Sequence, residues 1–444
     1  MFSQWSGPEL SKVKTLLSGP IAKSSMLSVG IKMASLLISF GQAILTARLL
    51  GVDGYGVVAF ALAMVNILAT ISVLGFGPMA VREIPAMKAS SGDKKVRSFL
   101  TLSFGLTMIC ALLIGAGLAI AAETTSLFPP ESRDAMALAG ALLVPHAILF
   151  LFNGWARGFS EIALAQVPNE LLRSAMMLIL LVAIFLLGQS LQPTQYLSMA
   201  IVIAGIATMI AAVWLWKARL RGLPRSEVAI SRMATLGSAM PFLGIGLVAL
   251  LQAEINTLLL SWLSGPREAG LFQPVARFMP LMTLGVTAAG MAFAPKVTEL
   301  WQRGEMRQVE DLTAKFTLTT TAITAIAGLC IAGAGPWLML VFGQDFVQSA
   351  PLLWYVAAAQ VFNAACGPVG MLLAAANKAT IVFRSLLFGL ASNLALGFAL
   401  IPDYGAFGAA LAMSASAVAW NCALIMGSRN SVPMNPTIIG SIRN

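Results

Sequence analysis

The chain has 444 residues, of which 58% are hydrophobic and only 10% are charged. Soluble globular proteins carry about 25% charged residues, so this composition indicates an integral membrane protein and excludes a soluble enzyme. The 28 Lys and Arg against 18 Asp and Glu give a net charge of +10, whose meaning depends on where these residues lie.

Twelve mainly apolar stretches are each close to the roughly 20 residues that cross a bilayer as a helix. They cover residues 24–50, 57–80, 98–122, 136–155, 172–188, 196–216, 240–263, 271–294, 316–342, 351–375, 385–401 and 407–427. We therefore expect an all-α polytopic membrane protein. Its expected parts are an N-terminal tail (1–23), a first lobe (24–216), a linker (217–239), a second lobe (240–427) and a C-terminal tail (428–444).

The basic residues are distributed unevenly between the two sides of these stretches. Most of the 28 Lys and Arg lie in the tails and in the connections on the same side, whereas the opposite side has Arg48, Arg133 and Arg267. Positive charge is retained in the cytoplasm, so both tails are predicted to be cytoplasmic. Membrane topology then explains the net charge, and no nucleic-acid partner is expected.

Four residues of the first half are candidates for a functional site. Lys32 is either a cavity lysine or an anchor at the interface, because residues 33–50 alone are long enough to cross. Arg48 borders the first outer loop, where snorkelling is the ordinary interpretation. His146, near the middle of the fourth stretch, either relays protons or is a neutral, packed histidine. Asn66 either faces a cavity or joins two helices.

Glu254 is the only acidic residue inside any of the twelve stretches. Its depth, about 14 Å from the outer end, is close to that of Arg277 on the following stretch. Glu254 is therefore either a proton or sodium carrier or half of a permanent ion pair with Arg277. Gln252 and Asn256 share one helix face, and Glu254 lies about 200° from either, so only one of these faces looks squarely into a cavity.

Arg277 lies inside the eighth stretch, where an arginine costs about 2.5 to 3.5 kcal/mol to insert. It either binds an anionic ligand, pairs structurally or snorkels to the outer headgroups. Pro274 and Pro280 flank it, and they predict a bend that is either a gate or a static kink. Gln273 is a further polar candidate for a cavity wall.

Other kinds of chemistry find little support in the sequence. The four cysteines lie singly in apolar stretches and predict neither disulfides nor a metal site. No combination of His, Asp, Ser or Cys predicts a catalytic residue, so we expect neither an enzyme nor a cofactor.

The chain repeats itself at an offset of about 215 residues. GVDGYG (51–56) joins the first two stretches, and SGPREAGLF (264–272) joins the seventh and eighth. A basic segment follows each pair. Six stretches per half predict two lobes of the same orientation, related by an axis along the membrane normal.

Three segments suggest a family: LTARLLGVDGYGVVAF (45–60), FAPKVTELWQRGE (293–305) and IPDYGAFGAALA (401–412). Together with the twelve stretches and the repeat, they resemble the polysaccharide-transport branch of the multidrug/oligosaccharidyl-lipid/polysaccharide exporter superfamily, the Wzx-type flippases, over about residues 24–427. The resemblance implies a V-shaped molecule of two six-helix lobes around a central cavity. It also implies ion-coupled transfer of a polyprenyl-diphosphate-linked oligosaccharide from the cytoplasmic to the outer leaflet of a bacterial plasma membrane.

This resemblance gives the candidate residues their expected roles. We expect the diphosphate to be bound by Arg277, Lys32 and Arg48, the coupling ion (H⁺ or Na⁺) by Glu254 and His146, and the cavity to be lined by Gln252, Asn256, Asn66 and Gln273. The expected partners are the lipid-linked oligosaccharide, membrane lipids and the polysaccharide polymerase machinery.

Two kinds of alternative remain. One is a drug or peptidoglycan-lipid exporter of the same superfamily, although basic cavity residues argue against a cationic drug and peptidoglycan flippases usually have two further spans. The other is a scaffold of polysaccharide assembly that transports nothing.

Overall fold

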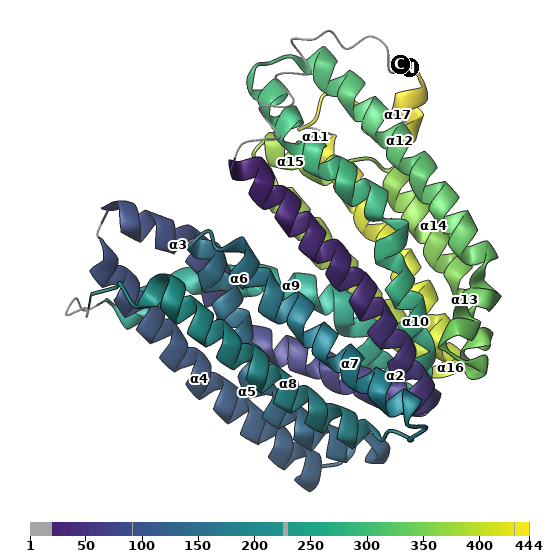
Figure 1. Cartoon of the computed structure of the whole chain (residues 1–444). Coiled ribbons are helices and arrows are strands. Elements are labelled where there is room, and N and C mark those ends of the chain that lie inside the picture. Colours follow the sequence, from purple (N-terminus) through teal and green to yellow (C-terminus); the bar gives the residue numbers. More distant parts are fainter. Residues whose placement is uncertain (1–19, 91, 225–229, 430, 444) are drawn as a thin grey trace.

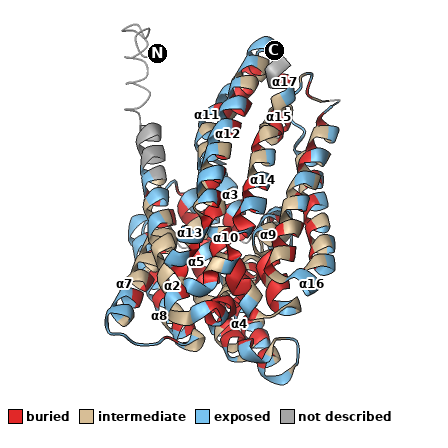
Figure 2. Cartoon of the chain, turned by 90° about the vertical axis from the view of Figure 1, so that its right-hand side faces the viewer, coloured by how far each residue is buried: buried red, intermediate tan, exposed pale blue. Residues whose placement is uncertain are grey.

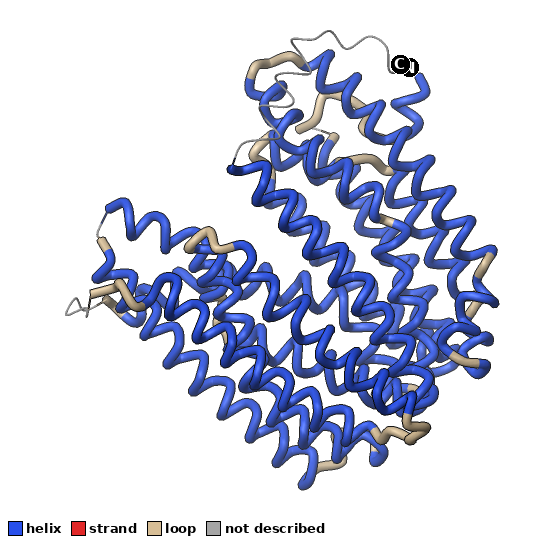
Figure 3. The backbone as a smooth tube through the Cα atoms, viewed as in Figure 1, coloured by secondary structure: helices blue, strands red, loops and turns tan. Residues whose placement is uncertain are grey.

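The computed structural model describes residues 20–90, 92–224, 230–429 and 431–443. Within these ranges the chain is helical with short connections and contains no strand (Figure 3). Ten helical segments of the described chain are long and apolar enough to cross a membrane. The protein is a multi-pass membrane protein.

The helices of the N-terminal half are coloured from purple to teal in Figure 1. They are α2 (Pro20–Ser72), α3 (Phe76–Ser90), α4 (Asp93–Thr124), η1 (Pro130–Ser132), α5 (Arg133–Gly158), α6 (Ile162–Gln166), η2 (Val167–Leu172), α7 (Arg173–Leu186), α8 (Pro193–Leu215) and η3 (Trp216–Leu220). Both η2 and η3 are π-helical turns.

The C-terminal half continues the same pattern of long helices. It consists of α9 (Arg232–Leu263), α10 (Pro266–Met282), α11 (Leu284–Gln302), α12 (Met306–Gly333), α13 (Gly335–Phe342), η4 (Gln344–Ser349), α14 (Leu352–Ala365), α15 (Val369–Ala375), α16 (Ala379–Ser428) and α17 (Ile438–Arg443).

Two groups of helices diverge from a common base, as Figure 1 shows. One group contains α3 to α8 and the other α10 to α17, and the buried apolar side chains form separate cores that follow this division. Helices α2 and α9 connect the groups. The first half of α2 packs into the second group, where Phe40 contacts the rings of Phe278 and Phe342 at centroid distances of 5.3 and 5.7 Å.

The base of the V is formed where α2 crosses α10. The two segments that meet there are equivalent parts of the internal repeat, 214 residues apart. Gly51 (φ 68°, ψ −175°) and its counterpart Gly265 (φ 92°, ψ 169°) adopt the same left-handed turn, which glycine enters without steric cost. A Cβ on Gly56 would stand 1.7 Å from the carbonyl oxygen of Pro266, and a Cβ on Gly270 would stand 2.0 Å from that of Val52. Both pairs are related by the same offset, so the two backbones touch symmetrically. Figure 2 shows the buried residues gathered around this base.

Several of the expected stretches are interrupted in the structure. Helix α10 passes through Pro274 and ends after Pro280, and α11 begins beyond Thr283. The interruption thus falls at Thr283, three residues after Pro280, and not at Arg277. A similar break precedes α15, at Pro368.

Candidate functional site

A polar cavity of about 300 Å³ lies where the two groups of helices meet. Its wall is formed by side chains of α2, α5, α7, α8, α9 and α10. Its polar lining residues are Ser39, Gln42, Thr46, Tyr55, Asn66, His146, Arg173, Ser174, Tyr196, Glu254, Gln273 and Arg277. Such a concentration of polar groups inside an apolar helical protein marks the principal candidate site.

Arg277 enters this cavity from the middle of α10. Its side chain keeps a large surface exposed to the cavity and interacts with the hydroxyl groups of Tyr55 and Tyr196. The Tyr55 hydroxyl is buried and has no hydrogen-bond partner of regular geometry in the described chain. The guanidinium group therefore meets neutral hydroxyls and open space, which leaves most of its five donors available to a ligand.

Glu254 faces the same cavity from α9 but is bound by a different neighbour. Asn66 of α2 donates its Nδ2 hydrogen to Glu254 Oε1 over 2.9 Å. Arg277 is close enough to interact with this carboxyl electrostatically, yet no salt bridge joins them in the described structure. The permanent ion pair, one of the two alternatives for Glu254, is therefore absent from the described structure, and the carboxyl is hydrogen-bonded to α2 instead.

Arg173 supplies a second guanidinium group from the N-terminal helices. Its Nη1 lies 2.6 Å from Nδ1 of His146, on α5. A guanidinium only donates, so His146 accepts at Nδ1 and its ring is neutral. Neither Arg173 nor Arg277 forms a salt bridge within the ranges described, and Glu254 is the one carboxylate of the cavity wall. The fixed charge of the cavity is therefore positive when Glu254 is ionised.

An apolar cavity of about 370 Å³ adjoins the polar one. It lies between α2, α3, α5 and α9, and its large side chains include Phe150, Phe242 and Leu250. Asn66 and His146 belong to the walls of both cavities. The two cavities therefore adjoin at these two side chains, and they offer a polar and an apolar surface side by side.

Four expected site residues lie elsewhere. Lys32 is exposed on the first half of α2 and does not line the polar cavity. Arg48 donates its Nε hydrogen to the carbonyl oxygen of Val341 over 2.7 Å, which ties α2 to α13.

The face of α9 that carries Gln252 and Asn256 also points away from the polar cavity. Gln252 donates to the carbonyl oxygen of Leu386 over 2.8 Å, and Asn256 is buried with 2% of its surface exposed. The opposite face, with Glu254, is the one that looks into the cavity. Gln273 lies in the wall of the polar cavity, and it donates to the hydroxyl of Thr257 over 2.8 Å.

Sequence reasoning missed Arg173, Tyr55 and Tyr196. Arg173 is the second residue of the fifth apolar stretch (172–188). At that position it looks like a basic residue of the preceding connection. The π-helical turn η2 directly precedes Arg173 and contains Pro168. This proline is the one feature of the sequence that indicates an irregular helix beside Arg173. Tyr55 belongs to the Gly-rich turn between the first two stretches, and nothing in the local pattern distinguishes it from a turn residue.

The described residues contain no group of three or more His, Cys, Asp or Glu side chains that could hold a metal ion. The comparisons with known proteins instead address the family and the fold. Residues 21–301 match the sequence family described as "Polysaccharide biosynthesis protein". The chain belongs to this family. No curated protein matches it in a sequence search.

Among solved structures, this member of the polysaccharide biosynthesis family is similar to transporters of the MOP superfamily. The lipid II flippase MurJ in an inward closed conformation has a TM-score of 0.73, 15% identity, and coverage of 91% of this chain and 87% of that one. An inward-facing multidrug resistance MATE family transporter has a TM-score of 0.70, 15% identity, and coverage of 91% and 97%. An outward-facing structure of a MATE family transporter has a TM-score of 0.56, 16% identity, and coverage of 94% and 97%. These likenesses establish the MOP transporter fold.

Proposed function

We propose that this protein is a flippase that carries a polyprenyl-diphosphate-linked oligosaccharide from the inner to the outer leaflet by alternating access. The observation that carries the proposal is the pair of guanidinium groups, Arg173 and Arg277, in a polar cavity that adjoins an apolar one. Arginines without carboxylate partners attract a diphosphate, whose charge the lipid interior does not solvate. Membership in the polysaccharide biosynthesis family supports a glycan cargo.

The same cavity disfavours a cationic drug as cargo. A cation would meet two guanidinium groups and a single carboxylate, and the carboxylate already accepts a hydrogen bond from Asn66. A flippase does not alter the covalent structure of the lipid that it moves, so the proposal includes no enzymatic step. Because the fold also occurs in a lipid II flippase, amphiphilic lipids are compatible with it.

The two longest helical segments support the membrane arrangement that belongs to this proposal. Gly30–Ser90 (61 residues) turns at Gly51, and Ala379–Ser428 (50 residues) turns at Gly405, so each is long enough to cross twice. We infer twelve crossings in two lobes, with both termini in the cytoplasm of a bacterium and the V open to that side. Coupling to H⁺ or Na⁺ through Glu254 and contact with the polymerase machinery belong to the same proposal.

The function is tested by depleting the protein in its native cell and analysing membrane lipids by mass spectrometry. We expect one polyprenyl-diphosphate oligosaccharide to accumulate, and re-expression of the wild type to remove it. Arg277→Ala should fail to do so, whereas the control Arg307→Ala, an exposed cation on α12, should restore normal levels. Unchanged lipids together with unchanged surface polysaccharide would contradict the flippase proposal and favour an exporter of another substrate.

A further inference from the structure

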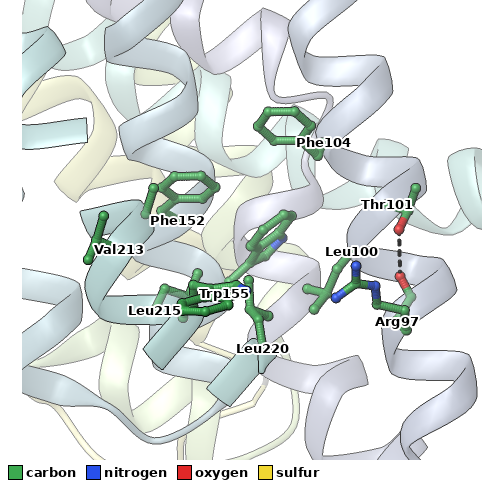
Figure 4. Close-up of a pocket in the computed structure, with 11 residues that line it drawn as sticks. Arg97, Leu100, Thr101, Phe104, Phe152, Trp155, Val213, Leu215 and Leu220 are labelled. Atoms are coloured by element: carbon green, nitrogen blue, oxygen red, sulfur yellow. Dashed lines mark hydrogen bonds between the residues drawn. The ribbon is translucent and has the colours of Figure 1, made fainter. Parts of the chain in front are cut away.

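A further pocket of the N-terminal helices lies outside the polar and apolar cavities. It has a volume of about 490 Å³ and lies between α4 and α8, which both pack on α5 (Figure 4). Its walls include Arg97, Phe104, Phe152, Trp155 and Trp216, and it shares no lining residue with the polar or the apolar cavity. Whatever occupies it is therefore not the transported molecule in its central site.

The inner part of this pocket is aromatic and apolar. Phe104 and Phe152 stack at a centroid distance of 6.2 Å and an angle of 11°, and Trp155 lies 5.2 Å from Phe152. Phe104 and Trp216 are 36% and 50% exposed, so the pocket opens on the outer, lipid-facing surface. Aromatic side chains of this kind pack well against an acyl chain, and Trp is typical of the membrane interface.

One end of the pocket carries a cation that forms no salt bridge with any described residue. Arg97 lies in the second turn of α4, and Figure 4 shows its guanidinium group directed toward Leu100 and Trp155. No salt bridge of the described structure includes Arg97, although the nearby Arg219 is paired with Glu161 at 2.6 Å. The Nε1 of Trp155, a residue only 3% exposed, also has no hydrogen-bond partner among the described residues.

The position of these groups along the helices matches a lipid headgroup region. Arg97 is near the start of α4, whereas Trp155 and Trp216 are near the ends of α5 and α8, so all three occupy the same end of the bundle. That end also carries Lys94 and Arg221, whose Cζ stands 6.0 Å from the Trp216 ring centroid. Anionic lipids collect beside such basic segments.

We propose that this pocket binds a glycerophospholipid with an anionic headgroup. One acyl chain lies against Phe104, Phe152 and Trp216, and the phosphate accepts hydrogen bonds from Arg97. The π-helical turn η3 forms one wall, at the point where the chain leaves the N-terminal helices for α9. The proposal holds whether or not the protein is a flippase, because it depends on this pocket alone.

The test is native mass spectrometry of the purified full-length protein with phosphatidylglycerol and with phosphatidylcholine of the same acyl chains. We expect the wild type to retain phosphatidylglycerol about five-fold more tightly, as one well-placed cation near the membrane surface provides. Arg97→Ala should remove most of this preference. Lys94→Ala, which removes an equal charge from the same helix outside the pocket wall, should keep it.

A second variant fills the pocket without changing the charge. Val213→Trp places a large ring in the pocket wall, and because Val213 is 45% exposed, we expect the substitution to leave the packing of the protein intact. It should reduce the number of tightly held phosphatidylglycerol molecules by one. Equal retention of the two lipids by the wild type would overturn the proposal. So would equal losses for Arg97→Ala and Lys94→Ala, which would indicate diffuse surface charge, or an unchanged lipid count for Val213→Trp.

Discussion

Arg277 and Arg173 reach the polar cavity from opposite groups of helices, α10 and α7. Each is placed beside neutral partners: hydroxyls of Tyr55 and Tyr196 for Arg277, and the ring of His146 for Arg173. An arginine in the membrane interior costs several kcal/mol, and an ion pair would offset much of this cost. Two unpaired arginines therefore fit a site whose counter-charge arrives with the ligand.

The first prediction concerns the affinity for a diphosphate. Arg277→Ala should weaken binding of a polyprenyl diphosphate to the purified protein about ten-fold or more, because a hydrogen bond to a charged group is lost. Arg277→Lys should recover part of the loss, since lysine keeps the charge but not the two-pronged contact. Isothermal titration calorimetry measures both, and an Arg277→Ala protein that binds as tightly as the Arg307→Ala control would remove Arg277 from the site.

Glu254 is the residue on which ion coupling depends in the proposal. Glu254→Gln keeps an oxygen that accepts the hydrogen bond of Asn66 but never carries a charge or a transferable proton. We expect it to bind substrate normally while transport in liposomes no longer responds to an imposed H⁺ or Na⁺ gradient. A variant that still follows the gradient would assign Glu254 a structural role.

At this scale the sequence predicts the site only in part. Arg277 and Glu254 stand out because charged residues inside apolar stretches are costly and rare, and both line the cavity. Arg173 and Tyr55 escape prediction because they sit at the ends of such stretches, where polar residues are ordinary. Only the fold brings these ends toward the centre.

The crossing of α2 and α10 is the element that closes the base of the V. Its glycines allow two helix backbones to touch, and the exposed pair Asp53 and Arg267, which occupy equivalent positions of the repeat, meet there at 3.4 Å. A solvent-exposed pair of this kind contributes little, on the order of 0 to 1 kcal/mol. The close approach of the backbones, rather than the charges, therefore holds this end together.

A methyl group at the crossing should separate the two helices. Gly270→Ala would place its Cβ 2.0 Å from the Val52 carbonyl oxygen, so we expect a loss of about 1 to 3 kcal/mol in stability. Gly117→Ala is the matched control, because Gly117 lies inside α4 with nothing within 4 Å of the added atom. Thermal unfolding in detergent compares the two, and equal melting temperatures would show that the crossing yields without cost.

Helix positions were more predictable than helix interruptions. The apolar stretches locate the long helices because a helix that crosses the bilayer needs about 20 mainly apolar residues. The break at Thr283 lies beyond Pro280 and not beside Arg277, and Ala334 divides the expected ninth stretch into α12 and α13. These interruptions depend on packing against neighbouring helices, which a single sequence does not display.

For the whole molecule, the wider separation of the helix groups lies at the end with the basic connections (Figure 1). In the proposed topology, this end lies in the cytoplasm and the base, which carries Asp53 and Arg267, faces outward.

This orientation makes a prediction for labelling in intact cells. In a background without the native cysteines, Arg267→Cys should react with a membrane-impermeant maleimide added outside. Arg303→Cys, in the connection between α11 and α12, should react only after the membrane is opened. The reverse pattern would invert the topology and, with it, the direction of the proposed transport.

The most direct test of the central proposal is transbilayer movement of a polyprenyl-diphosphate oligosaccharide in liposomes that contain only the purified protein. An added glycan-modifying enzyme outside the vesicles reports which molecules have reached the outer leaflet. We expect the wild type and Arg307→Ala to expose the whole lipid pool and Arg277→Ala to expose only the fraction initially outside. Equal exposure with and without protein, or undiminished movement by Arg277→Ala, would contradict a flippase that holds its cargo at this arginine.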